Sequence, residues 1–145
     1  MNARKQKSQA GTVLVEAAFT LLLLFTFLLG IIEAGHFLNE QEIVTNAARE
    51  GARMAVAPLT QTTTLLTPAQ ITTNVKTFLT ASNVKCAAAC VTVEPSVQFA
   101  PNPAPTFTRV TVQANYRLIT MSMFSSINNL TLQGVAVMRN ETSPY

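Results

Sequence analysis

The hydrophobic and polar positions divide the chain into an apolar first part, an amphipathic middle and an alternating last part. Residues 17–32 contain no charged side chain. Counting back to Thr12 gives a mostly apolar span of about 31 Å, enough to cross a hydrocarbon core of roughly 30 Å. The helical pattern continues without proline to Ala57 and is stopped by Pro58. We therefore expect one long helix over residues 12–57, with a transmembrane segment at about 12–32.

The outer half of this predicted helix has a narrow stripe of mostly small residues, namely Phe37, Val44, Ala48, Gly51 and Ala55. Small side chains at helical spacing allow another element to approach the helix backbone closely. Two partners fit such a stripe, another subunit or the head domain of the same chain, and the sequence leaves both open.

The pattern after Pro58 predicts a small head domain over residues 58–145. Thr67 is a suitable N-cap before Pro68, and apolar residues recur at helical spacing, which predicts a helix over residues 68–82. Alternation then predicts three strands at 91–93, 108–116 and 130–138. The predicted fold class is α+β, a long N-terminal helix followed by a head of one helix and about three antiparallel strands.

Two connecting segments of the head have compositions typical of loops. Residues 60–64 are polar and rich in threonine, which favours an exposed connector. Pro101, Pro103 and Pro105 predict a stiff loop between the first two strands.

The charge distribution adds a direction to the predicted membrane segment. The formal net charge of +3 comes from Arg4, Lys5 and Lys7, which all precede the apolar segment. The next charges beyond it are acidic: Glu33, Glu40 and Glu42. The positive-inside rule therefore predicts a single-pass protein with a cytoplasmic N-terminus and its head outside the cytoplasm. A cleaved secretory signal is the alternative, although the apolar run is long for one.

The composition disfavours several functions. The chain has no Asp, no Trp and a single histidine, His36, so it offers little material for acid–base or metal chemistry. Its excess positive charge lies in residues 1–11 and cannot form a nucleic-acid-binding face. We expect no enzymatic activity, no cofactor or metal, no small-molecule substrate and no nucleic-acid partner.

The end of the basic leader resembles a type IV prepilin signal. Gly11 follows the leader, and Glu16 lies five positions beyond it within the apolar segment. The resemblance implies that a prepilin peptidase cuts between Gly11 and Thr12, which leaves residues 1–11 as a removed leader. A carboxylate in lipid is costly without a positive partner, and the new ammonium at Thr12 of a neighbouring subunit would supply one. Alternatively, Glu16 only snorkels to the interface.

A second motif lies on the outer half of the predicted helix. The run Thr45–Arg53 resembles the N-A-A-R-E-G-A-R signature of the TadE-like family, carried here by Asn46, Ala47, Ala48, Arg49, Glu50, Gly51 and Arg53. The resemblance implies a minor pilin or pseudopilin of the tight-adherence (Flp) pilus system, located in the inner membrane with a periplasmic or extracellular head. Its implied partners are other pilins or pseudopilins and Flp assembly proteins, and its implied roles are pilus biogenesis, adhesion and biofilm formation.

Two alternatives remain at the level of sequence. The head would act as an adhesin at the pilus tip or cell surface if it binds a surface ligand. The charges of the motif either contact a neighbour or form a solvated Glu50–Arg53 bridge on one helix face. Cys86 and Cys90 form C-A-A-A-C, which favours a structural disulfide in an oxidising compartment over a redox or zinc site, provided that the segment is not helical.

Overall fold

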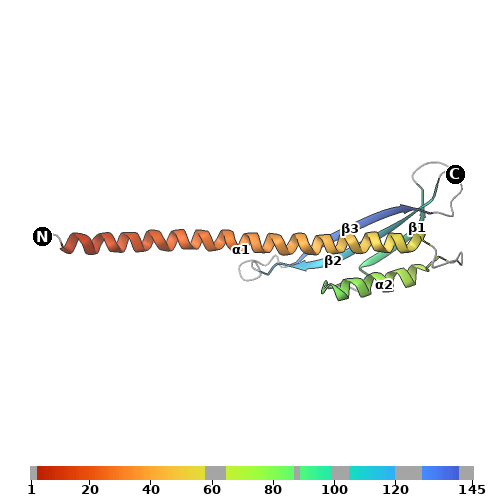
Figure 1. Cartoon of the computed structure of the whole chain (residues 1–145), viewed down its shortest axis with the longest axis horizontal. Helices are drawn as coiled ribbons and strands as arrows, with labels where there is room; N and C mark the ends of the chain where they lie inside the picture. The colour runs from red at the N-terminus through yellow and green to blue at the C-terminus, as the bar shows by residue number, and fades with distance from the viewer. Residues whose placement is uncertain (1–2, 58–64, 87–88, 99–104, 120–128, 141–145) are drawn as a thin grey trace. The chain divides into compact units, whose positions relative to one another are not determined.

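The computed structural model describes residues 3–57, 65–86, 89–98, 105–119 and 129–140, and its description of side chains begins at Gly11 (Figure 1). The elements follow in the order α1 (Ala3–Val56), α2 (Pro68–Ala81), β1 (Val91–Val97), β2 (Phe107–Arg117) and β3 (Asn129–Arg139). The predicted α+β class, with a long helix, a short helix and three antiparallel strands, is confirmed. The chain divides into two compact units, Met1–His36 and Phe37–Tyr145.

Helix α1 begins earlier than expected and ends where the sequence predicts. It starts at Ala3 rather than near Thr12, because the leader contains alanine, arginine, lysine and glutamine, which are good helix formers, and no proline. The helix ends at Val56, and the N–H of Ala57 still donates to the carbonyl of Arg53 at 3.0 Å.

Helix α2 has the predicted N-terminal cap. The Thr67 hydroxyl accepts from the N–H of Gln70 at 3.4 Å, and the Gln70 side chain accepts from the N–H of Thr67 at 3.0 Å. This capping box satisfies two backbone donors that the first turn cannot pair internally. The apolar face of α2 is buried through Ile71, Val75 and Leu79, the spacing expected of an amphipathic helix.

The sheet has the strand order β1-β2-β3 with antiparallel neighbours. Alternate residues of the central strand are buried, namely Thr108, Val110, Val112, Ala114 and Tyr116. Strand β1 extends beyond the predicted 91–93 because an irregularity between Glu94 and Val97 accommodates Pro95. A proline is tolerated at such a bulge on an edge strand.

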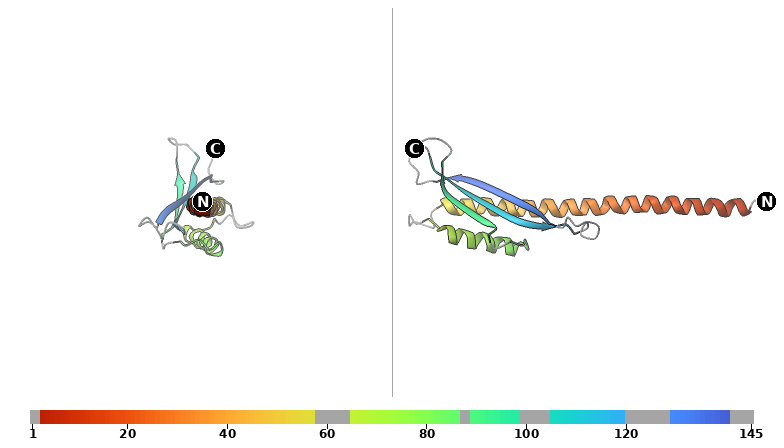
Figure 2. Two further views of the ribbon diagram at one scale, coloured as in Figure 1. Left: turned by 90° about the vertical axis from the view of Figure 1, so that its left-hand side faces the viewer. Right: turned by 180° about the vertical axis from the view of Figure 1, so that it is seen from behind.

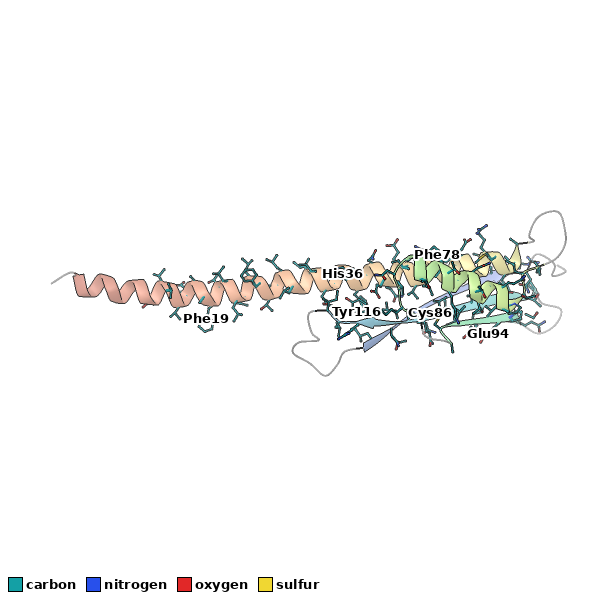
Figure 3. All side chains as sticks on the ribbon, turned by 90° about the horizontal axis from the view of Figure 1, so that it is seen from below. Phe19, His36, Phe78, Cys86, Glu94 and Tyr116 are labelled. Atoms are coloured by element: carbon teal, nitrogen blue, oxygen red, sulfur yellow. A yellow bond between two sulfur atoms is a disulfide. The ribbon has the colours of Figure 1, made fainter. Side chains whose placement is uncertain are left out.

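One core joins the sheet to both helices. The outer half of α1 and helix α2 lie on the same face of the sheet (Figures 1 and 2). Figure 3 shows Tyr116 between β2 and α1, and its ring meets that of Phe37 edge to face at 5.5 Å between centroids. The predicted connector at residues 60–64 and the loop prolines Pro101 and Pro103 lie outside the described residues.

Candidate functional site

The first part of α1 has an uncovered apolar surface. Every side chain from Gly11 to Ile32 is exposed, and Leu14 and Ile31 are 74% and 69% exposed. Phe19, labelled in Figure 3, belongs to this segment and is 67% exposed. Within the described residues, one helix is long and apolar enough to cross a membrane, and it is this one. Because such a surface is unfavourable in water, the segment indicates membrane anchoring.

Two threonines of the apolar segment form hydrogen bonds within the helix, whereas Glu16 forms no ion pair among the described residues. The hydroxyls of Thr20 and Thr26 donate to the carbonyls of Glu16 and Leu22 at 2.9 Å and 2.8 Å. This bond to the fourth preceding residue lets a threonine lie within an apolar helix. The Glu16 side chain is exposed and makes no ion pair with any residue that the structure describes.

Gly11 and Thr12, the predicted cleavage residues, lie within α1 and not at its start. A Cβ added at Gly11 would meet nothing within 4 Å. The described fold therefore gives no packing reason for glycine at this position, and cleavage between Gly11 and Thr12 stays a prediction.

The second motif separates into a buried face and an exposed face. Ala47, Ala48 and Gly51 are buried against the head, whereas Asn46, Arg49 and Arg53 are exposed and Glu50 is half-exposed. A Cβ at Gly51 would approach side-chain carbons of Val75 on α2 and Val110 on β2 to 2.8 Å and 3.1 Å. The small residues therefore let α1 lie close to both α2 and the sheet.

The stripe of small residues, left open between two partners, is covered by the head of the same chain. Val44, Ala48, Gly51 and Ala55 are buried, and Phe37 is half-buried. The closest approach is at Gly134 on β3, where an added Cβ would lie 2.6 Å from the Val44 carbonyl oxygen. Backbone therefore meets backbone at this point, and only glycine fits it.

Comparison with known families confirms the resemblance for the first long helix. Residues 11–53 match the family model of TadE-like proteins. These residues, the TadE-like segment, contain the apolar anchor and most of the helix face that packs on the head. No curated protein and no solved structure matches the chain.

One ion pair lies within the TadE-like segment. Arg53 donates to both carboxylate oxygens of Glu50, at 2.9 Å from Nε and 2.6 Å from one terminal nitrogen. This hydrogen bonding lowers the pKa of Glu50 below its ordinary value and raises the pKa of Arg53. The predicted bridge on one helix face is thus present, and solvent screening keeps its contribution small.

Two charged residues on the exposed face of the TadE-like segment were given little weight in the sequence interpretation. Glu42 and Arg49 are exposed, and neither makes a hydrogen bond or ion pair with any described residue. Their signal was available in the sequence as opposite charges seven positions apart on one helix face. The side-chain amide of Gln41 donates to the Gln133 carbonyl on β3 at 3.0 Å. No pattern in the sequence indicates this contact.

Outside the TadE-like segment, the head has one covalent link. Cys86 and Cys90 both lie outside the helices and strands, and they are joined by a disulfide with 5.6 Å between their Cα atoms. A depression of about 500 Å³ beside it is lined by side chains that include Glu40, Lys85 and Arg117. The described residues contain no cluster of metal-ligating side chains.

Proposed function

We propose that this chain is a minor pilin or pseudopilin-like structural component of the tight-adherence (Flp) pilus system. It is anchored in the inner membrane through residues 12–32, with its N-terminus in the cytoplasm and its head outside. Prepilin peptidase removes residues 1–11, and the mature chain associates with other pilins and Flp assembly proteins. In this role it supports pilus biogenesis, and through the pilus it supports adhesion and biofilm formation.

One observation carries the proposal. The match to TadE-like proteins covers residues 11–53, and the same residues combine an uncovered apolar surface with a small-residue face buried under the head. Neither a cleaved secretory signal nor a simple signal anchor would need its helix to continue as a core element of the head.

The state of Glu16 supports an assembly role. Its carboxylate lies in an apolar segment without a positive partner among the described residues. A charge in this environment is stabilised when assembly supplies a cation, and the ammonium created at Thr12 by cleavage is such a cation. The processed end of one subunit would then neutralise Glu16 of the next.

The N-terminal sequence of the mature protein tests the proposal. Wild-type protein purified from cells that assemble the pilus should begin at Thr12. Gly11→Leu should retain the leader, because the peptidase site no longer fits the residue before the cut. Gly35→Leu is the matched control, since added Cβ atoms at Gly11 and Gly35 both meet nothing within 4 Å. It should be processed normally, whereas wild-type protein that begins at Met1 would contradict the proposal.

Glu16→Gln separates processing from assembly. The variant should lose its leader but fail to support pilus formation, because the amide cannot pair with an ammonium as strongly as a carboxylate does. Glu33→Gln, at the other end of the apolar segment, should form pili normally. If the Glu16→Gln strain formed as many pili as the wild type, the proposed assembly role of this carboxylate would be contradicted.

A deletion of the head is a poor test of the adhesin alternative. Removing residues 59–145 would uncover Val44, Ala47, Ala48 and Ala52, which are fully buried in the intact chain. The truncated protein would then fail for reasons of folding. Charge substitutions on the exposed surface of the head, with pili counted and adhesion measured separately, distinguish the two functions without this defect.

A further inference from the structure

The end of the head unit that carries Phe37 has two cations beside an exposed apolar side chain. Lys85 and Arg117 line the depression of about 500 Å³ beside the disulfide, and Ile119 lines it too, with 59% of its surface exposed. Both cations are exposed, and neither makes an ion pair with any described residue. Arg117 follows Tyr116, whose ring meets that of Phe37. Lys85, Arg117 and Ile119, which we call the basal patch, therefore lie near the point at which the chain enters the head.

The position of Lys85 is fixed by the structure on both sides of it. Helix α2 ends in a Schellman motif, in which Asn83 has a positive φ of 59° and the N–H of Val84 donates to the Leu79 carbonyl at 2.9 Å. Val84 and Leu79 are both buried, so the chain is held to the core directly before Lys85. Directly after it, Cys86, labelled in Figure 3, is held by the disulfide. The exposed Lys85 side chain therefore extends from a backbone that is restrained on either side.

Arg117 is positioned by the sheet. It is the last residue of the central strand β2, and its side chain points away from the core because that of the preceding Tyr116 is buried. The depression is also lined by the amides of Asn83 and Asn115 and by the carboxylate of Glu40. Two cations and one carboxylate leave one positive charge in excess, and the amides add hydrogen-bond donors. The depression is thus suited to a negatively charged oxygen-rich group.

The covalent link to the apolar span limits how far this end of the head can lie from a membrane. Phe37 follows Ile32, the last residue of the predicted span, by five residues. Even a fully extended chain covers at most about 3.6 Å per residue, so the link reaches no more than about 18 Å. The headgroup region itself extends roughly 6 Å beyond the hydrocarbon core. Lipid headgroups are therefore a short distance from the end of the head that carries the basal patch.

We propose that the basal patch binds the headgroups of anionic phospholipids in the membrane that anchors the chain. Lys85 and Arg117 pair with the lipid phosphates, and Ile119 packs at the boundary between headgroups and acyl chains. Cations beside an apolar side chain are the combination by which a protein surface binds anionic lipid. The inference goes beyond the proposed pilus role, and of that proposal it needs only the anchoring through residues 12–32.

The apolar residue and the anchor favour a lipid surface over a free anion. A phosphate ion in solution would use the two cations and the amides of the depression but not Ile119. A bilayer offers phosphate and hydrocarbon side by side, and both parts of the basal patch then have a partner. One excess positive charge at an exposed site attracts an anion only weakly. The anchor keeps the patch at a high effective concentration of headgroups, which makes a weak contact sufficient.

A single tryptophan can report the contact, because the chain contains no natural tryptophan. The full chain with Ile119→Trp is reconstituted into phosphatidylcholine vesicles with or without phosphatidylglycerol, using lipids brominated near the headgroup end of the acyl chains. Bromine quenches a tryptophan that reaches it, so quenching should be strong with phosphatidylglycerol and weak without it. High salt should reduce the quenching, since it screens the cations. Both leaflets have the same composition, so the orientation of the inserted chain does not affect the result.

Single-charge variants in the Ile119→Trp background test the named residues. Lys85→Gln and Arg117→Gln should each lower the ratio of lipid-bound to unbound heads about fivefold, the effect of one basic residue at an anionic membrane surface. Glu40→Gln should raise this ratio, because it removes the carboxylate of the depression, and a gain of contact is not a result of misfolding. Arg49→Gln is the matched control and should have no effect, since it neutralises an exposed arginine that does not line the depression.

A second reporter, Leu23→Trp, separates anchoring from headgroup binding. It lies within the predicted span and should be quenched in both kinds of vesicle, and absence of this quenching would overturn the anchoring together with the inference. If Leu23→Trp is quenched but Ile119→Trp responds equally with and without phosphatidylglycerol, the headgroup contact is wrong and the proposed function is unaffected. An Ile119→Trp signal that follows the protein-to-lipid ratio instead would indicate contact between copies and would also refute the lipid contact. Headgroup binding by a chain that proves dispensable for pili would retain the inference and remove the proposed function.

Discussion

The two parts of α1 have the same secondary structure but contact different surroundings. From Gly11 to Ile32 the side chains are mostly large, apolar and exposed. From Val44 to Val56 the inward-facing side chains are mostly alanine, and they are buried by the sheet and α2. The first part needs lipid or other helices around it, and large side chains suit that purpose. The second part needs close contact with its own head, and small side chains suit that.

The family match lies within α1 and includes residues of both parts. It covers residues 11–53, the anchor and most of the face that receives the head, and it leaves the sheet and α2 outside. Two requirements constrain the sequence of α1. Its first part must suit a membrane, and its second part must present small residues to the head. The matched residues of this chain thus lie in α1 alone.

The largest expected effect comes from placing the same substitution in the two parts. Gly134→Val should destabilise the head by more than about 3 kcal/mol, because backbone atoms of α1 lie within 3 Å of the added Cβ and cannot move aside cheaply. Gly30→Val, in the apolar part, meets nothing within 4 Å and should leave the head unchanged. Urea unfolding of the detergent-solubilised protein, followed by tyrosine fluorescence, measures the difference. Equal stability of the two variants would contradict the described contact between α1 and β3.

A charge in the apolar part should act on membrane insertion rather than on the head. Leu23 and Leu38 are both exposed leucines of α1, at 59% and 64%. Leu23→Arg should oppose insertion by about 3 kcal/mol, the cost of arginine near the centre of a membrane helix. Leu38→Arg lies beyond the predicted span and should insert normally. The fraction of protein recovered with membranes after carbonate extraction compares them, and an equal loss for both variants would place the span elsewhere.

The sequence predicted the elements more completely than their contacts. The periodicity of Ile71, Val75 and Leu79 and the alternation in β2 and β3 identified these elements because one face of each is buried. The sequence predicted β1 only over residues 91–93, because Pro95 disfavours a strand beyond that point. The stripe on α1 indicated a close partner, but small residues do not specify which partner. The approach of Gly134 to Val44 joins residues ninety positions apart, and no local pattern predicts such a contact.

The sequence motif identified residues 46–53 as a group but not how they divide between two faces of α1. The TadE-like motif pointed to Asn46–Arg53 as one group. The structure separates it into small residues that hold the head and charged residues that face outward. This division depends on where the head sits around α1, which the sequence of α1 alone does not contain.

The smallest expected effect concerns the Glu50–Arg53 pair, which should matter little because it faces solvent. The hydrogen bond from Arg53 lowers the pKa of Glu50 in the folded state. A lowered folded-state pKa contributes stability that is present above the unfolded pKa and is lost as pH falls through the folded pKa.

Wild-type protein should therefore be slightly more stable than Glu50→Gln at neutral pH, and the difference should vanish in acid below the folded pKa. Glu42→Gln removes an exposed carboxylate of the same helix that makes no ion pair with any described residue, and it should show no such pH-dependent difference. Thermal unfolding of the three proteins across this pH range, repeated at high salt to screen the pair, measures the effect. A Glu50→Gln deficit that grows toward low pH would show that the carboxylate acts through some contact other than Arg53.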